Sequence, residues 1–117
     1  MKPAEIVTAY LTAYTSGDIE RAASLVSEDF SFQGPMQATA GRRALRKIAA
    51  HVAANARGHQ ILRQWQDDHD VCTLYQLHVH VDSHATSLLV SEWNTVRGGN
   101  VASSLMVFDT GRFRGAG

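Results

Sequence analysis

Apolar residues at the start of the chain recur at helical spacing and form one stripe. The stripe consists of Ile6, Val7, Tyr10, Leu11 and Tyr14. This spacing predicts a first helix that begins near Pro3 and stops at Gly17. Asp18 is a favourable N-cap for a short second helix, whose apolar positions run from Ile19 to Val26.

A third helix is predicted between Gly41 and Ala56, and Gly58 is expected to end it. Its buried stripe consists of Leu45, Ile48, Ala49 and Val52. A short strand over residues 29–32 precedes this helix, and Gly34-Pro35 begins a loop that runs to about residue 39.

From residue 59 onward the pattern changes to the alternation typical of strands. Four strands are expected, over residues 59–66, 71–81, 86–97 and 101–109. Glycines in the turn over residues 98–100 supply the positive φ that tight hairpins need. Helices followed by an antiparallel meander indicate an α+β fold. We expect a single domain over residues 1–110 and a disordered tail over 111–117.

Composition and charge limit the classes of function. The chain has 117 residues, which is enough for one domain. Lys and Arg together number 11, as do Asp and Glu, so no net field recruits nucleic acid or an anionic membrane. The local exception is the basic group Arg42, Arg43, Arg46 and Lys47. On a helix this group is interpreted as a solvated face, with phosphate binding as the alternative.

Cys72 is the one cysteine of the chain, so an internal disulfide is excluded and a reducing compartment is favoured. No apolar run approaches the roughly 20 residues of a membrane span. The N-terminus also lacks the apolar segment of a signal peptide. The expected location is the cytoplasm.

Several weak motifs occur in a characteristic order. They are Tyr10-Leu-Thr-Ala-Tyr14-x-x-Gly17-Asp18, Asp29-Phe…Gly34-Pro35, Gly41-Arg-Arg-Ala-Leu, and two strands joined by Gly-Gly that end in Phe108-Asp109. With this order and spacing the chain resembles the SnoaL-like branch of the nuclear transport factor 2 superfamily. That superfamily includes ketosteroid isomerases, polyketide cyclases and limonene epoxide hydrolases. The resemblance implies a cone-shaped fold, with three N-terminal helices packed on a curved antiparallel sheet around a pocket.

The resemblance to ketosteroid isomerases implies roles for three positions. Tyr10 matches the tyrosine that donates a hydrogen bond to the substrate carbonyl, although it is equally interpreted as a core residue. Gly34 stands where the isomerases have their general base, an aspartate before a proline. Ser91 stands where they have a second oxyanion donor, a protonated aspartate. A steroid-type isomerase is therefore disfavoured.

Two acids are candidates to replace the missing groups. Asp109 ends the last strand, where related cyclase-like sequences carry an acid. Strand alternation places Phe108 toward the pocket and Asp109 away from it, unless a bulge turns the chain. Glu92 is expected to face away as well, because Ser91 and Trp93 are placed on the pocket side. The Asp-Arg-Asp set of the epoxide hydrolases cannot be assembled from these strands.

Histidine is the commonest general base near neutral pH. His51 is predicted at the pocket rim and is a catalytic candidate together with Tyr10 and Asp109. His78 and His80 share one strand face, where a pair can bind a metal or lie on the outer side of the sheet. No third ligand has suggestive spacing, so no metal site and no cofactor are predicted.

The strongest remaining signal is an amphipathic pocket lining. The predicted lining consists of Tyr14, Phe32, Met36, Trp65, Tyr75, Ser91, Trp93, Met106 and Phe108. Such a wall suits a flat apolar ligand with one or two polar groups. The alternative is that these side chains are plain core.

The predicted function is that of a small enzyme that isomerises, cyclises or hydrates a hydrophobic, carbonyl-containing or polyketide-like molecule. The alternative is a non-catalytic ligand-binding or dimerisation module with the same pocket. The resemblance implies a homodimer through the outer sheet face. Nucleic acid and membranes are not expected partners.

Overall fold

The structure is a computed structural model that describes residues 1–111, with Val81 described in its backbone alone. The elements in chain order are α1 (Pro3–Ser16), α2 (Ile19–Ser24), β1 (Val26–Gln33), β2 (Ala38–Ala40), α3 (Arg42–Ala53), β3 (Ala56–Asp67), β4 (Asp70–Val81), β5 (His84–Arg97) and β6 (Asn100–Phe108). All three helices precede the four long strands, as the hydrophobic pattern predicts. The predicted tail beyond residue 111 lies outside the described residues.

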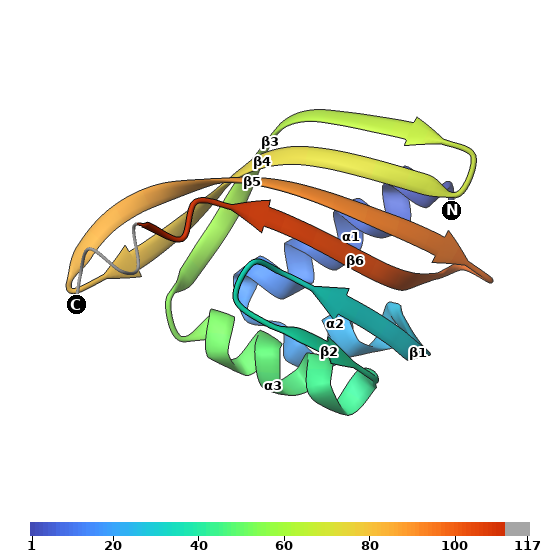
Figure 1. Ribbon diagram of the computed structural model, residues 1–117, viewed down its shortest axis with the longest axis horizontal. Helices are drawn as coiled ribbons and strands as arrows, with labels where there is room; N and C mark the ends of the chain where they lie inside the picture. The colour runs from blue at the N-terminus through green and yellow to red at the C-terminus, as the bar shows by residue number, and fades with distance from the viewer. Residues whose placement is uncertain (112–117) are drawn as a thin grey trace.

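The six strands form one sheet in the order β2-β1-β6-β5-β4-β3. Figure 1 shows β3, β4 and β5 arching together over α1, while β1 and β2 lie close to α3 at the other edge of the sheet. In the described part of the chain, helices cover the inner face of the sheet and no helix covers the outer face. Helices packed on a curved, unclosed sheet confirm the α+β cone.

One strand pair departs from the antiparallel expectation. β1 runs parallel to β6, with Phe32 opposite Ser104. At the start of this pair, the Val101 N–H donates to the Leu25 carbonyl at 2.8 Å. Parallel neighbours need a long connection between them, and the intervening helix α3 and the four strands β2 to β5 supply it.

The junction between α1 and α2 follows from local sequence. Gly17 has φ 87, the left-handed conformation that ends many helices, and its N–H bonds to the Ala13 carbonyl. The Asp18 carboxylate then accepts a hydrogen bond from the Arg21 N–H at 3.3 Å and caps α2, as predicted.

Several predicted boundaries are wrong. α2 ends at Ser24, and Val26 begins β1 instead of continuing the helix. Residues 38–40, expected in a loop, pair with β1 as strand β2. α3 ends at Ala53, so Gly58 does not terminate it. Gly58 lies inside β3 with φ 94, at a bulge where the pairing with β4 shifts register.

The core lies between α1 and the inner face of the sheet. β4 shows the alternation clearly, because Val71, Thr73, Tyr75, Leu77 and Val79 are buried while the residues between them are partly or fully exposed. His78 and His80 therefore lie on the outer face, as predicted. Among the helices described, none is long and apolar enough to cross a membrane.

Candidate functional site

A cavity of ≈ 450 Å³ lies between α3, the chain from β1 to β2, and the inner face of the sheet. Its apolar wall consists of Phe32, Pro35, Met36, Ile48, Val52, Ala56, Leu77, Val79, Leu88, Met106 and Phe108. Its polar positions are Tyr14, Gln37, Lys47, His51 and Asn55, and Gly34 contributes backbone. This volume is within the usual range for small-molecule sites, and the wall is mostly hydrophobic, as such sites are.

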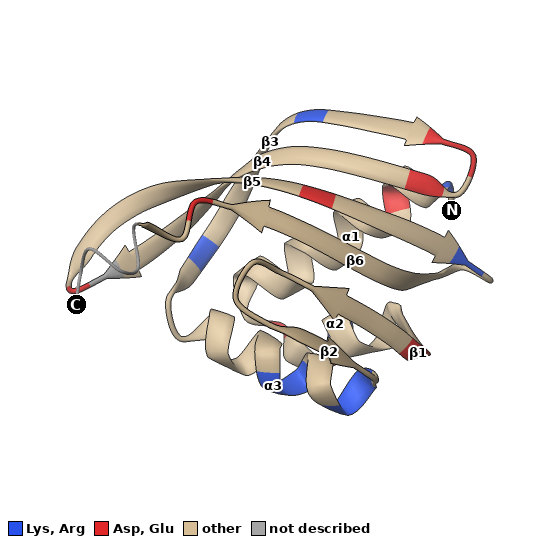
Figure 2. Ribbon diagram, in the orientation of Figure 1, with Lys and Arg blue, Asp and Glu red and all other residues tan. Residues whose placement is uncertain are grey.

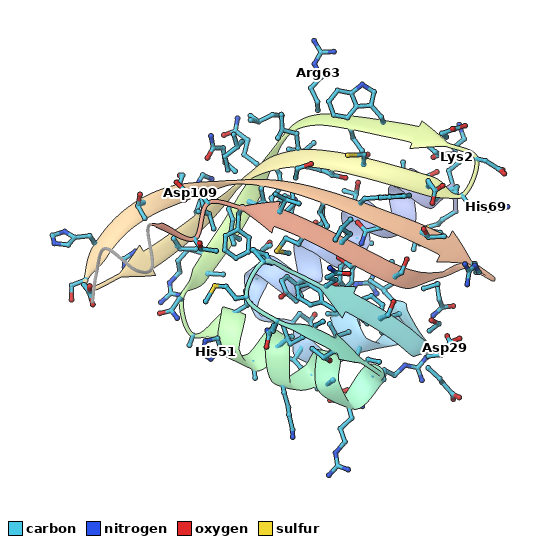
Figure 3. All side chains as sticks on the ribbon, in the orientation of Figure 1. Lys2, Asp29, His51, Arg63, His69 and Asp109 are labelled. Carbon is cyan, nitrogen blue, oxygen red and sulfur yellow. The ribbon has the colours of Figure 1, made fainter. Side chains whose placement is uncertain are left out.

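Helix α3 forms one side of the cavity. Ile48 and Val52, one turn apart, turn toward its interior. Lys47 and His51 are also one turn apart and border the same cavity, but both side chains are exposed. Figure 3 shows His51 at the end of α3. The helix therefore gives the cavity an apolar floor and a basic rim.

Tyr14 is the buried polar group of the wall. It comes from α1, and its ring lies 5.6 Å from that of Tyr10. Burial, together with the nearby Glu92 carboxyl, raises the pKa of Tyr14 far above its usual value. The phenol thus stays protonated at any physiological pH and is a hydrogen-bond donor, not a base.

A buried carboxyl group lies deeper in the cone, beyond the cavity lining. Glu92 is 1% exposed. Its Oε1 accepts a hydrogen bond from the Tyr75 hydroxyl at 2.8 Å. Its Oε2 accepts from the Asn94 amide at 3.0 Å and from the Ser104 hydroxyl at 2.8 Å. The side chain is thus held by three donors from three strands.

Burial raises the pKa of the Glu92 carboxyl, and the hydrogen bonds from Tyr75, Asn94 and Ser104 offset only part of that effect. The Asn94 Oδ1 is buried without a hydrogen-bond partner. A cluster of polar side chains inside a core lowers stability unless each group has a hydrogen-bond partner. The sequence pattern did not predict this buried cluster around Glu92.

The structure gathers most of the predicted lining into this cavity. The predicted site residues in its wall are Tyr14, Phe32, Met36, His51, Met106 and Phe108. Tyr10 and Tyr75 also point inward, but they are buried in the core behind the wall and do not border the cavity. Asp109 is exposed and accepts a hydrogen bond from the Gly111 N–H at 2.9 Å. Figure 3 shows it beyond the end of β6, apart from His51.

The predicted orientation of β5 is wrong. Trp93 is 50% exposed and lies on the outer face, whereas Glu92 points into the core. Ser91 faces outward with Trp93, within 3.9 Å of the Cys72 sulfur. Trp65, 52% exposed, lies on the same outer face. The reason is a register shift between β5 and β6, where Ala102 is left without a partner.

Three polar lining residues were not predicted, namely Gln37, Lys47 and Asn55. Lys47 directly precedes Ile48, which belongs to the buried stripe of α3. This position at the edge of the stripe was the signal that could have placed Lys47 beside the cavity. Two other members of the basic group are engaged elsewhere. Arg42 donates to the Val26 carbonyl at 2.9 Å, and Arg46 pairs with Glu20 at 3.2 Å.

Charged residues are unevenly distributed around the cavity. Figure 2 shows Lys and Arg gathered on α3. Among the described residues that border the cavity, none is an Asp or Glu. In the described part of the chain there is also no cluster of three or more His, Cys, Asp or Glu residues that could hold a metal ion.

Comparisons with known proteins agree with this architecture. The SnoaL-like domain family matches residues 7–115. A solved structure from Kribbella flavida has a TM-score of 0.86 at 21% identity, covering 96% of this chain and 90% of the other. An epoxide hydrolase of M. tuberculosis, described as LEH-like, has a TM-score of 0.81 at 16% identity, covering 97% and 87%. TerC, crystallised with polyporic acid, has a TM-score of 0.81 at 18% identity, covering 97% and 96%. No curated protein matches the chain.

Proposed function

We propose, from the premise that this chain belongs to the SnoaL-like domain family, that it binds a small apolar carbonyl compound in the cavity and transfers a proton on it. One observation carries the proposal. The wall of a single, mostly apolar cavity contains Tyr14, which carries a phenol, and His51, which carries an imidazole. These are the two group types that polarise a carbonyl and accept a proton from carbon.

The proposed chemistry is an isomerisation without net change in composition. The Tyr14 hydroxyl donates a hydrogen bond to the carbonyl oxygen, and the His51 imidazole removes a proton from the adjacent carbon. The electron pair of the broken C–H bond passes to the oxygen, giving an enolate that Tyr14 stabilises. His51 then returns the proton to another carbon of the conjugated system. Cyclisation would use the same enolate as a carbon nucleophile.

Tyr14 replaces Tyr10 as the carbonyl-binding residue in this proposal. Tyr10 is buried behind the cavity wall, and Asp109 lies at the exposed end of β6. Neither of them borders the cavity. Two similar structures, an epoxide hydrolase and a protein crystallised with polyporic acid, support a small organic substrate.

Exchange of α-protons for deuterium, followed by ¹H NMR in D₂O, tests the proposal with a panel of flat aromatic ketones. We expect the protein to accelerate exchange, His51→Gln to reduce that acceleration roughly a hundredfold or more, and Tyr14→Phe to reduce it by a similar factor. Tyr10→Phe and His69→Gln are matched controls, since neither residue borders the cavity. Binding without accelerated exchange in the wild type would exclude the catalytic step.

A non-catalytic ligand-binding module is the second candidate. It is favoured by the lack of a carboxylate among the described residues that line the cavity and by glycine at position 34, where the isomerases have their base. An added Cβ at Gly34 would come within 3.2 Å of the Phe32 ring, so the wall is closely packed at this point. The exchange experiment separates the two candidates, because both bind ligand and only one moves a proton.

We also propose that the chain forms a homodimer through the outer face of the sheet. On that face a row of side chains crosses the strands β3, β4, β5 and β6. The row consists of Trp65, Cys72, Trp93 and Leu105, in that order. Leu89 and Val107 extend this apolar area and are more than half exposed. Neighbouring exposed apolar side chains on one face are typical of protein–protein contacts. The proposed location is the cytoplasm, which suits the free Cys72 thiol.

A further inference from the structure

We propose that the ligand of the cavity is an apolar carbonyl compound that also carries a carboxylic acid, held with its body inside the cone and its carboxylate at the mouth, against Lys47. The proposal rests on the proposed function, because it names the substrate class of the same cavity. It follows from the charges that the chain itself places around the cavity.

The fixed charge beside the cavity is positive. Lys47 and the imidazole of His51 border the cavity, and none of the described residues that line it is an Asp or Glu. The remaining polar lining groups, Tyr14, Gln37 and Asn55, are neutral amides or a phenol. An anion entering this cavity meets a cation and several hydrogen-bond donors without a repelling carboxylate.

The basic groups stand at the rim and the apolar groups inside. Lys47 and His51 are exposed and one helical turn apart, whereas Ile48, between them, is 7% exposed. A ligand that satisfies both regions has an apolar body and one charged end. Its carboxylate remains partly hydrated at the rim, so binding does not require full removal of water from the charge.

Lys47 is available for this role. Arg46, its neighbour, is paired with Glu20 at 3.2 Å, and Arg42 lies 3.9 Å from Glu28 and bonds the Val26 carbonyl. Within the described residues Lys47 makes no ion pair. The buried carboxyl of Glu92 lies among hydrogen-bond donors and does not border the cavity.

Two probes with the same body test the proposal, 2-naphthoate and its neutral analogue 2-naphthamide. Isothermal titration calorimetry is done with the wild type and with Lys47→Gln. We expect the wild type to bind naphthoate more tightly than naphthamide. The Gln variant should weaken naphthoate binding by roughly three- to tenfold, in keeping with a partly exposed charge pair, and leave naphthamide binding unchanged. Added salt should weaken naphthoate binding to the wild type only.

Arg43→Gln is the matched control, because it removes the same charge from an exposed position of α3 that does not border the cavity. An equal loss of naphthoate affinity in both variants would mean a diffuse charge effect and overturn the proposal. Equal binding of both probes to the wild type would also overturn it while leaving the cavity as a ligand site. Failure of both probes to bind would instead contradict the proposed function.

Discussion

At the scale of single residues, the Glu92 carboxyl connects folding to pH. Its pKa is raised in the folded state, so the folded chain holds a proton that the unfolded chain has released above its ordinary pKa of about 4.5. Because the unfolded state then binds fewer protons, the free energy of unfolding falls as pH rises from that value toward the folded-state pKa. Below the ordinary pKa both states are protonated and the penalty disappears.

Replacing Glu92 with Gln removes this titration while keeping the shape of the neutral acid. We expect the stability of Glu92→Gln relative to the wild type to increase with pH above about 4.5, by at most about 1.4 kcal/mol per pH unit. Urea unfolding of both proteins at several pH values measures the difference. Burial lowers the pKa of His59, but His59 is present in both proteins, so its contribution to the pH dependence cancels.

Glu92→Leu is the contrasting variant. It removes the acceptor and leaves the Tyr75, Asn94 and Ser104 donors without their partner, at a cost of about 1–3 kcal/mol for each buried group that stays unsatisfied. A relative stability of Glu92→Gln that does not change with pH would show that the carboxyl titrates alike in the folded and unfolded chain. That result would contradict the assigned direction of its pKa.

At the scale of elements, hydrophobic period and local caps were sufficient to predict the helices. The stripe of α1, Gly17 at its end and Asp18 as the next cap all act within a few residues, so they can be recognised in sequence. β2 was missed because it is three residues long and depends on pairing with β1. Short strands carry too little pattern to distinguish them from loops.

The inner and outer faces of β5 were not predictable from alternation. Its inward residues include Glu92 and Asn94, whereas Leu89 and Trp93 point outward, so hydrophobicity gives no clear choice of face. Counting a regular hairpin from the Gly98-Gly99 turn would pair Trp93 with Ser104. The extra residue Ala102 pairs Asn94 with Ser104 instead, and a shift by one residue exchanges the faces. For this reason Ser91 and Trp93 were wrongly predicted to line the candidate site.

The Asp18 cap offers a test at this scale. We expect Asp18→Ala to lower the free energy of unfolding by about 1 kcal/mol, because the Arg21 N–H loses its acceptor at the start of α2. Asp18→Asn keeps an acceptor in place and should cost only a few tenths of that. Thermal unfolding of the three proteins measures the order. Equal loss in both variants would assign the effect to the charge of Asp18 instead of its hydrogen bond.

At the scale of the whole molecule, the sheet presents its two tryptophans to the outside. Trp65 and Trp93 are about half exposed, at 52% and 50%, and lie away from the cavity. Their fluorescence is therefore expected to report assembly through the outer face, not occupancy of the cavity. If both tryptophans lined the cavity, as the sequence predicted, their fluorescence would instead report ligand binding.

We expect the wild type to sediment as a dimer and Trp93→Arg as a monomer, because an arginine in the middle of the apolar row would be buried without a partner. Tryptophan emission of the wild type should shift to the blue as concentration increases. Ala50→Arg, an exposed position on α3, is the control and should remain a dimer. A wild type that stays monomeric with red-shifted emission at every concentration would exclude the proposed interface.

The parallel pairing of β1 with β6 has a consequence for the making of the protein. The chain leaves the ribosome N-terminus first, so β1 emerges long before the strand beside which it must lie. Until β6 arrives, the Leu25 carbonyl lacks the Val101 N–H, and the cavity lacks the side chains of Met106 and Phe108. The cavity is thus completed by β6, the last of the described strands in chain order. A nascent chain interrupted before residue 100 would have helices, three long strands and an open cavity that lacks one part of its wall.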